Sequence, residues 1–290
     1  MERAGRASIL VVCLATSVIA AAPPGPSLLS GPYQVGRLGV LNLTITNVND
    51  VKEVKGVYVS GARCDFKPQD SLLEGTFEGS VLVGKLTTCL EGAGCGTTGV
   101  VPFLGVVSDT SITTYVTIPG NCAAPGLDDN PLTITVDYAW LKKVGEDAIK
   151  AAKWDVAITH LRRAVQLPMG ANDPQMLNLL GVAYNGSKAF ADGRQTFEAA
   201  LEFAKKKGAP PDVKAQLYFN LACSESALAG GDPARQSQAI SYLKQALQLS
   251  PSALVREGLA TDGDLDPLRG LPEFQKLIGR KRPRAPGYFE

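Results

Sequence analysis

The sequence is poor in the residues from which most catalytic and metal sites are built. Its 290 residues include one histidine, His160, so a His-rich metal site is excluded and a catalytic triad would depend on that side chain. No G-x-S-x-G turn is present to expose a serine nucleophile. His160 has no partner visible in the sequence, which favours a partly exposed helical residue. We therefore predict that the chain is not an enzyme and binds no cofactor or metal.

Charge of one sign and long apolar runs are also scarce. With 29 basic and 28 acidic residues, the formal net charge is +1, which gives no electrostatic reason to expect a nucleic-acid partner. Beyond the N-terminus, no apolar stretch approaches the ~20 residues that a spanning helix needs, so we expect no stable membrane insertion. The near-neutral total is the sum of an acidic first half and a basic second half. Residues 21–137 hold 6 basic and 11 acidic residues, whereas residues 138–290 hold 21 and 16.

The first 22 residues have the pattern of an export signal. Arg3 and Arg6 precede a short apolar run from Ile9 to Ile19, and three alanines follow at Ala20–Ala22. We predict a signal peptide over 1–22, with cleavage after Ala20 or Ala21, and a Pro/Ser-rich linker over 23–30. The mature chain is then expected to be extracytoplasmic, either periplasmic or secreted.

The cysteines cluster in the first half of the mature chain. Cys13 lies in the predicted signal, and Cys223 stands alone in the second half, where we expect a buried thiol. No pair of the remaining four has the C-x2-C spacing of a zinc site, and exported domains favour disulfides. We predict two disulfides, with all three connectivities open, among Cys64, Cys89, Cys95 and Cys122.

Residues 31–137 alternate apolar and polar side chains in short runs separated by Gly, Asn, Asp and Pro. Such runs predict strands and turns of a small antiparallel β domain, either a barrel or a sandwich. The predicted strands are 38–46, 54–59, 72–86, 100–107, 111–118 and 132–138. The arrangement is loosely similar in architecture to the lipocalin and avidin meanders, without a diagnostic motif of either family.

The same half contains the letters of a dinucleotide-binding motif between Gly94 and Gly99. That motif requires a following helix whose N-terminus faces a pyrophosphate, and here another predicted strand follows. Because Cys95 lies inside the motif, we interpret the segment as a disulfide-stapled hairpin loop.

From Tyr138 onward the apolar period becomes helical, and three segments share a spacing. The first runs through Gly145, Trp154, Leu161 and Ala164 to Leu167. The second and third have their small residues at Gly181 and Ala222 and their large ones at Phe197 and Leu243. This spacing resembles that of the tetratricopeptide repeat (TPR) family. The resemblance implies three repeats over 138–251, in which the small residues let two antiparallel helices approach and the large ones fill the space between successive hairpins.

The segment after the repeats resembles the closing segment of many bacterial TPR arrays. The resemblance implies capping helices over 252–279, followed by a basic, flexible tail over 280–290. Asp262, Asp264, Asp266 and Glu273 have the spacing of an EF-hand, but Pro267 replaces its obligatory glycine. We therefore predict that Asp264 or Asp266 caps a helix beginning near Pro267. The expected fold is an all-β domain followed by an all-α TPR superhelix.

The resemblance also implies a binding face. In the family, ligands lie along the concave face that the first helix of each hairpin forms. Glu146 replaces an Asn of the set that clamps C-terminal carboxylates in some members, which disfavours chaperone-tail ligands. A mere spacer is the alternative. The groove positions carried over are Lys142, Glu146, Asn178, Val182, Asn185, Gln216, Phe219 and Cys223.

These expectations lead to one main hypothesis and two rivals. The main one is an exported, non-enzymatic interaction or scaffold protein of the bacterial cell envelope, which binds a partner protein or peptide in the TPR groove. The first rival places an apolar or saccharide small ligand inside the β-barrel, with the repeats as a spacer. The second is a hydrolase, which would need clustered carboxylates or Ser and His in one cleft.

Overall fold

The computed structural model describes residues 28–61, 64–118, 120–127, 129, 131–250 and 253–279. The predicted signal peptide, most of the predicted linker and the predicted basic tail lie outside these residues. The end of the linker prediction needs correction, because Leu28 is buried against the β domain and Leu29 accepts a hydrogen bond from the Tyr33 hydroxyl (2.9 Å). Residues 28–30 therefore belong to the β domain.

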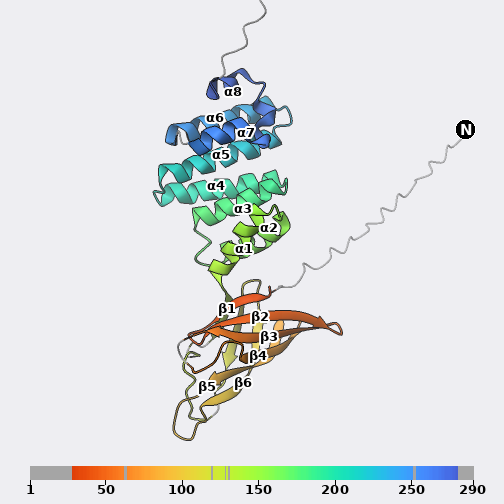
Figure 1. The fold of residues 1–290 in the computed structure, drawn as a ribbon, viewed down its shortest axis with the longest axis vertical. Helices are drawn as coiled ribbons and strands as arrows, with labels where there is room; N and C mark the ends of the chain where they lie inside the picture. The colour runs from red at the N-terminus through yellow and green to blue at the C-terminus, as the bar shows by residue number, and fades with distance from the viewer. Residues whose placement is uncertain are drawn as a thin grey trace, which may run out of the picture.

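The first half of the chain forms a closed antiparallel barrel. Each strand pairs with the next, and β1 closes the sheet by pairing with β8 (Figure 1). This result selects the barrel over the sandwich. The strands are β1 (Gly31–Val35), β2 (Gly39–Val48), β3 (Val51–Ser60), β4 (Ser71–Glu78), β5 (Val81–Cys89), β6 (Thr98–Val107), β7 (Ser111–Val116) and β8 (Leu132–Val136).

Two strand predictions were incomplete. The run predicted over 72–86 is two strands, β4 and β5, because the chain reverses at Gly79, whose φ of 63° is readily reached only by glycine. Strand β1 was missed, since its five residues are too few to show a clear alternation. Both errors concern where strands begin and end, and the all-β prediction for this half is confirmed.

Large side chains fill the interior of the barrel. Alternate residues of the strands point inward, as the period of two requires. Fully buried examples come from six strands: Tyr33, Leu41, Leu43, Leu73, Leu82, Leu86, Ile112, Leu132 and Ile134. This packing argues against the small-ligand chamber that the alternative hypothesis placed inside the barrel.

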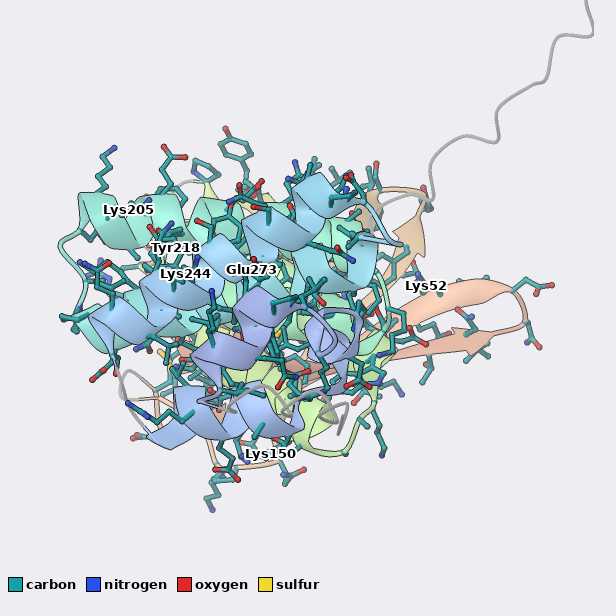
Figure 2. All side chains as sticks on the ribbon, turned by 90° about the horizontal axis from the view of Figure 1, so that it is seen from above. Lys52, Lys150, Lys205, Tyr218, Lys244 and Glu273 are labelled. Carbon is teal, nitrogen blue, oxygen red and sulfur yellow. A yellow bond between two sulfur atoms is a disulfide. The ribbon has the colours of Figure 1, made fainter. Side chains whose placement is uncertain are left out.

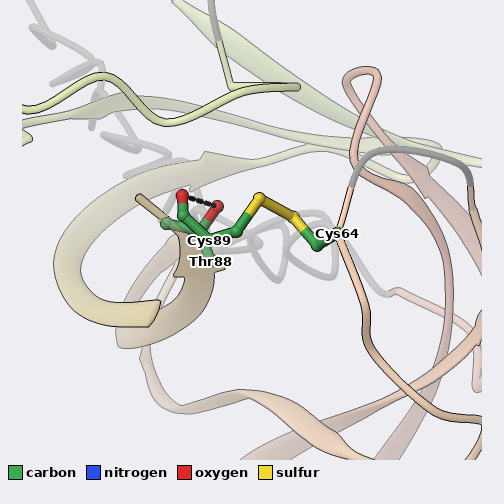
Figure 3. Close-up of a disulfide and its surroundings, with 3 residues drawn as sticks. All are labelled: Cys64, Thr88 and Cys89. Carbon is green, nitrogen blue, oxygen red and sulfur yellow. Dashed lines mark hydrogen bonds between the residues drawn. A yellow bond between two sulfur atoms is a disulfide. The ribbon is translucent and has the colours of Figure 1, made fainter. Parts of the chain in front are cut away.

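Two disulfides join the loops of the barrel, as predicted. Cys64 bonds to Cys89 at the end of β5, beside the buried Thr88 (Figure 3), and Cys95 bonds to Cys122. Cys89 and Cys95 are thus ends of different bridges. The loop from Gly94 to Gly99 leads into β6 and not into a helix, which confirms its interpretation as a stapled loop and rejects the dinucleotide motif.

The second half stacks helical hairpins above the barrel (Figure 1). Three hairpins form from α1 with α2, α3 with α4, and α5 with α6, and shorter elements follow them. The helices are α1 (Tyr138–Lys150), α2 (Trp154–Gln166), α3 (Pro174–Gly186), α4 (Phe190–Lys206), α5 (Pro211–Leu228), α6 (Pro233–Leu249), α7 (Ala253–Thr261), the 3₁₀ helix η1 (Gly263–Leu268) and α8 (Pro272–Leu277).

The predicted small and large residues meet within each of the first two hairpins. A methyl group on Gly145 would overlap Leu161, and one on Gly181 would overlap the ring of Phe197. Leu161 and Phe197 therefore fill the space over the glycine of their own hairpin. The prediction that such large residues lie between successive hairpins was wrong. The close approach itself was predicted correctly.

The prediction that Asp264 or Asp266 caps the helix near Pro267 was wrong. Asp262, not Asp264 or Asp266, accepts the backbone N–H of Asp264 (2.9 Å) and begins η1, while Pro267 lies inside that short helix. Leu265, Leu268 and Phe274 are fully buried beneath this region. They pack with Ile240 and Leu243 of α6, so the segment contacts the apolar side of the third hairpin.

A single residue connects the barrel to the helices. Asp137 follows β8 and caps α1, because its carboxylate accepts the N–H of Trp140 (2.6 Å). The Trp140 ring lies directly over Gly31 of β1, where any side chain would collide with it. The first hairpin is thus packed against the barrel and not merely tethered to it.

Removing a disulfide should destabilise the barrel selectively. The Cys95–Cys122 bridge joins residues 27 apart, so its loss in Cys95→Ser/Cys122→Ser should lower the free energy of unfolding by about 2–4 kcal/mol. A guanidinium titration followed by circular dichroism measures this, with retained helical signal as the internal control. An unchanged barrel transition would contradict the structural role of the bridge.

Candidate binding groove

A depression lies where α1, α3 and α5 meet on one side of the helical stack. Its volume is about 210 Å³, and side chains from all three helices surround it. The lining residues are Lys142, Glu146, Gln175, Asn178, Leu179, Val213, Gln216 and Leu217. Four of the groove positions carried over from the sequence resemblance thus come together, namely Lys142, Glu146, Asn178 and Gln216.

The other carried-over positions do not line this depression. Phe219 packs over Gly258 of α7, and Val182 is half-buried against neighbouring apolar side chains. Asn185 is buried, and its side-chain oxygen accepts a hydrogen bond from the Ser224 hydroxyl (3.0 Å). Cys223 is buried as well. These residues hold helices together, because the stack brings a further helix over the positions that they occupy.

Four lining residues were missed by the sequence analysis. Gln175 lies three residues before Asn178 and four before Leu179, so all three border one face of α3. Val213 and Leu217 occupy the first turns of α5. Two prolines could have helped to predict these residues. Pro174 and Pro211 mark the first turns of α3 and α5, and counting in steps of three and four from a known start shows which early residues share a face.

The lining combines paired charge, amides and apolar surface. The Lys142 ammonium lies 4.0 Å from the Glu146 carboxylate, so the two charges largely cancel in a partly exposed pair. Asn178 accepts a hydrogen bond from the side chain of Asn220 (2.7 Å), which fixes its orientation on α3. Gln175 and Gln216 are exposed and offer both donors and acceptors. This surface suits an uncharged, hydrogen-bonding ligand.

The size of the depression decides between kinds of ligand. Pockets that enclose a whole small molecule measure ~300–1,000 Å³. At about 210 Å³ this depression is smaller, and its volume matches one or two side chains of a longer molecule. Its lining residues include neither a nucleophile paired with a base nor a pair of carboxylates.

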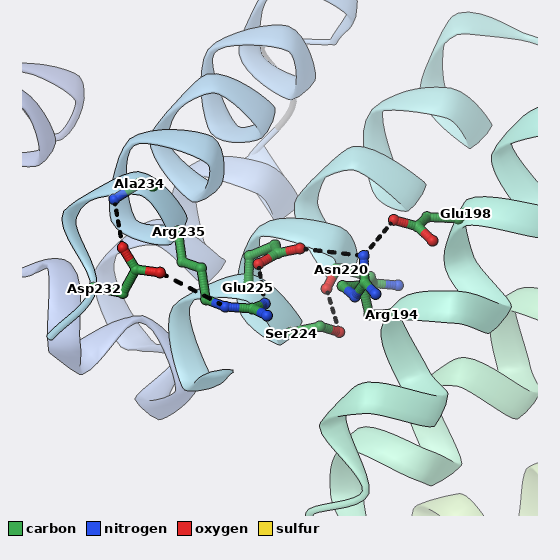
Figure 4. A network of polar contacts seen from close by, with 8 residues as sticks. All are labelled: Arg194, Glu198, Asn220, Ser224, Glu225, Asp232, Ala234 and Arg235. Atoms are coloured by element: carbon green, nitrogen blue, oxygen red, sulfur yellow. Dashed lines mark hydrogen bonds and ion pairs between the residues drawn. The ribbon is translucent and has the colours of Figure 1, made fainter. Parts of the chain in front are cut away.

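A polar network links three helices of the stack. Glu225 of α5 is buried, and its carboxylate contacts Arg235 of α6 (2.9 Å) and Arg194 of α4 (3.7 Å). Arg194 also pairs with Glu198 on the exposed side of α4 (2.9 Å), as Figure 4 shows. Three consecutive helices are thereby tied through one buried carboxylate, whose two arginine partners offset the cost of its burial.

The reactive side chains singled out in the sequence have structural roles. His160 is half-buried on α2, where its Nδ1 lies 2.8 Å from the Val156 carbonyl oxygen and its ring meets Trp140 edge-on. Burial, with a contribution from nearby Asp262, raises the pKa of the Cys223 thiol, which keeps it protonated and able to donate to that carboxylate (3.5 Å). Within the described ranges, no three His, Cys, Asp or Glu side chains form a metal-binding group.

Several lysines of the helical half that do not line the groove are exposed. Figure 2, which views the molecule from above, labels Lys150, Lys205 and Lys244, all of which are exposed on the helical part. The ammonium of Lys205 lies over the ring of Tyr218, 5.4 Å from its centre. Of the helices in the described part of the chain, none has the length and apolarity to span a membrane.

Comparisons with known proteins find similarity at the level of structure only. A scan against protein-family models and a search of curated proteins both found no match. Among solved structures, the N-terminal domain of stress-induced protein-1 from C. elegans is similar at 18% identity and a TM-score of 0.35, covering 41% of this chain and 89% of that chain. The Arabidopsis OM64 TPR domain gives 18% identity and a TM-score of 0.35, with coverages of 41% and 88%.

A third solved structure is the TPR2AB domain of yeast Sti1 in its pHSP90 complex. Its identity is 20% and its TM-score 0.36, and the match covers 42% of this chain and 45% of that chain. All three matches span less than half of this chain. At these scores they carry no conclusion about what the chain binds.

The buried carboxylate should contribute more to stability than its exposed neighbour. Glu225→Gln removes the charge that two arginines surround and should lower the free energy of unfolding by about 1–3 kcal/mol. Glu198→Gln removes a surface partner of the same Arg194 and should cost at most about 1 kcal/mol. Denaturant unfolding of both variants measures the difference, and equal effects would contradict the role assigned to Glu225.

Proposed function

We propose that the chain is an exported, non-enzymatic interaction or scaffold protein of the bacterial cell envelope, which binds a partner protein or peptide between α1, α3 and α5. The observation that carries the proposal is the depression itself. It is too small for a complete small-molecule ligand, it is lined by amides and apolar groups, and it opens on a stack of packed hairpins. These features favour one or two side chains of a partner chain lying across the helices.

The chemistry of the lining restricts the class of partner. Exposed amides of Gln175 and Gln216 match the donors and acceptors of an extended peptide backbone. Leu179 and Val213, both half-buried, supply apolar contact for a side chain of the partner. Because Glu146 accompanies Lys142, the groove offers no excess positive charge for a C-terminal carboxylate. The proposed ligand is therefore an internal, uncharged segment of a partner.

The proposed location rests on the cysteines. Disulfides form and persist in oxidising compartments, and two of them close loops of the barrel. Together with the signal peptide predicted from the sequence over 1–22, they support export. In this proposal the barrel is a rigid, stapled base on which the first hairpin is packed.

Site-specific photo-crosslinking tests the groove directly. A photoreactive residue at Gln216 should yield a discrete adduct with one envelope protein, whereas the same residue at Gln195, exposed on the outer helix α4, should not. Adding Asn178→Ala to the Gln216 variant should weaken the adduct by about tenfold, because it removes one hydrogen-bonding side chain from the lining and breaks its bond to Asn220. Equal adducts from positions 216 and 195 would reject the groove.

A further inference from the structure

The outer face of β6 is apolar from Val100 to Val106. After Thr98 at the start of the strand, its outward positions carry Val100, Pro102, Leu104 and Val106, and the three branched side chains are each more than half exposed. On the neighbouring strands, Tyr115 of β7 is 68% exposed. Exposed apolar patches of this kind mark interaction sites.

The contrast with the other strands is sharp. Outward positions on β2, β4 and β8 are occupied by Asn42, Thr44, Glu74, Thr133 and Thr135, as expected of a barrel wall in water. Away from β6 and its neighbours β5 and β7, the exposed large apolar side chains of the described strands are Val48, Val51 and Val59, which lie at the ends of β2 and β3. The most exposed ones are gathered in an apolar strip on β6 and on β7 beside it.

A hollow lies next to the strip on the same outer face. Gly75 of β4 and Gly84 of β5 are directly paired, and a side chain on either would point inward, toward Leu82 and Phe103. Because neither glycine has a side chain between the sheet and the core, β4 and β5 can lie closer to the core at this point. The resulting depression measures about 430 Å³, and its outward-facing lining residues are Glu53, Lys55, Glu74, Thr76, Val83 and Lys85.

Strand register places a protruding side chain and the hollow in one row. Thr76 pairs with Val83, Val83 with Leu104, and Leu104 with Tyr115, so the four residues lie side by side across β4, β5, β6 and β7. Thr76 and Val83 line the hollow at one end of the row. Tyr115 projects at the other end.

We infer that this face binds a second copy of the chain. A two-fold axis that runs along the strands between β5 and β6 exchanges β6 with β5 and β7 with β4. Each Tyr115 then faces Thr76 of the other copy, at the hollow, and each Leu104 faces Val83. Such a contact is self-complementary, as a symmetric dimer requires.

The same operation brings no like charges together. In the next row, Glu78 faces Thr113 and Val81 faces Val106, and on the other side Lys85 faces Pro102. Glu78 and Lys85 therefore each meet a neutral side chain. An apolar, uncharged strip also lacks the charge that would recruit a strongly acidic or basic partner.

The available area sets the strength of the dimer. Four strands about 4.8 Å apart and about eight residues long cover roughly 500 Å² on each copy, or about 1,000 Å² in total. Specific interfaces begin near this total, so the dimer should be weak, with a dissociation constant on the order of ten micromolar.

Sedimentation velocity over a concentration series tests the inference. The whole protein should shift from monomer to dimer, and Leu104→Glu should raise the dissociation constant by at least about tenfold because it places two carboxylates beside the axis. Thr133→Glu, outward on β8, is the matched control and should dimerise normally. A wild-type protein that stays monomeric, or equal dimerisation by Leu104→Glu, would overturn the proposal.

A cysteine pair tests the register independently of affinity. Glu78 and Thr113 lie three strands apart within one copy, about 14 Å at the usual strand spacing, which is too far for an internal bridge. Across the proposed axis they face each other. Glu78→Cys/Thr113→Cys should therefore form a covalent dimer on oxidation, while each single variant should not. Bridging by the single variants, or none by the double variant, would exclude this arrangement.

Discussion

The fold depends on the close approach of neighbouring elements at positions without a side chain. In the helical half, Phe197 occupies the space over Gly181, and Leu161 occupies that over Gly145. At the junction the ring of Trp140 lies over Gly31 in the same way. Each glycine carries a cost in helix or strand propensity, and the apolar packing that it permits offsets that cost. The distance between the two helices of each of the first two hairpins follows from these contacts.

The same constraint produces two surfaces with different chemistry. Hairpins held by apolar packing leave their first helices free to present amides and paired charge, and the buried Glu225 ties three helices behind that face. In the barrel, paired glycines hollow the wall and an apolar strand lies beside the hollow. The depression between α1, α3 and α5 and the hollow beside the apolar strip are therefore properties of separate halves.

Periodicity was enough to predict the two classes of structure, and local spacing predicted the close contacts of Gly145 and Gly181. The predictions that were wrong concern the residues at which helices begin and the residues over which a later helix packs. Asp262 was missed as a cap because several aspartates in that segment could serve, and only the path of the chain selects one. Phe219 was assigned to the groove because no periodicity shows that α7 packs over it. Disulfide connectivity likewise required the closed barrel, since four cysteines allow three pairings.

The free energy of unfolding of Gly181→Ala tests the packing account most directly. In a helix this change normally stabilises by about 1 kcal/mol. Gly270→Ala, in the turn between η1 and α8 where open space surrounds the added methyl group, is the control for a methyl group that meets no neighbour. We predict that Gly181→Ala instead destabilises by about 1–3 kcal/mol, because the methyl group overlaps the Phe197 ring, and that Phe197→Leu in the same chain recovers part of the loss. Stabilisation by Gly181→Ala would contradict the account.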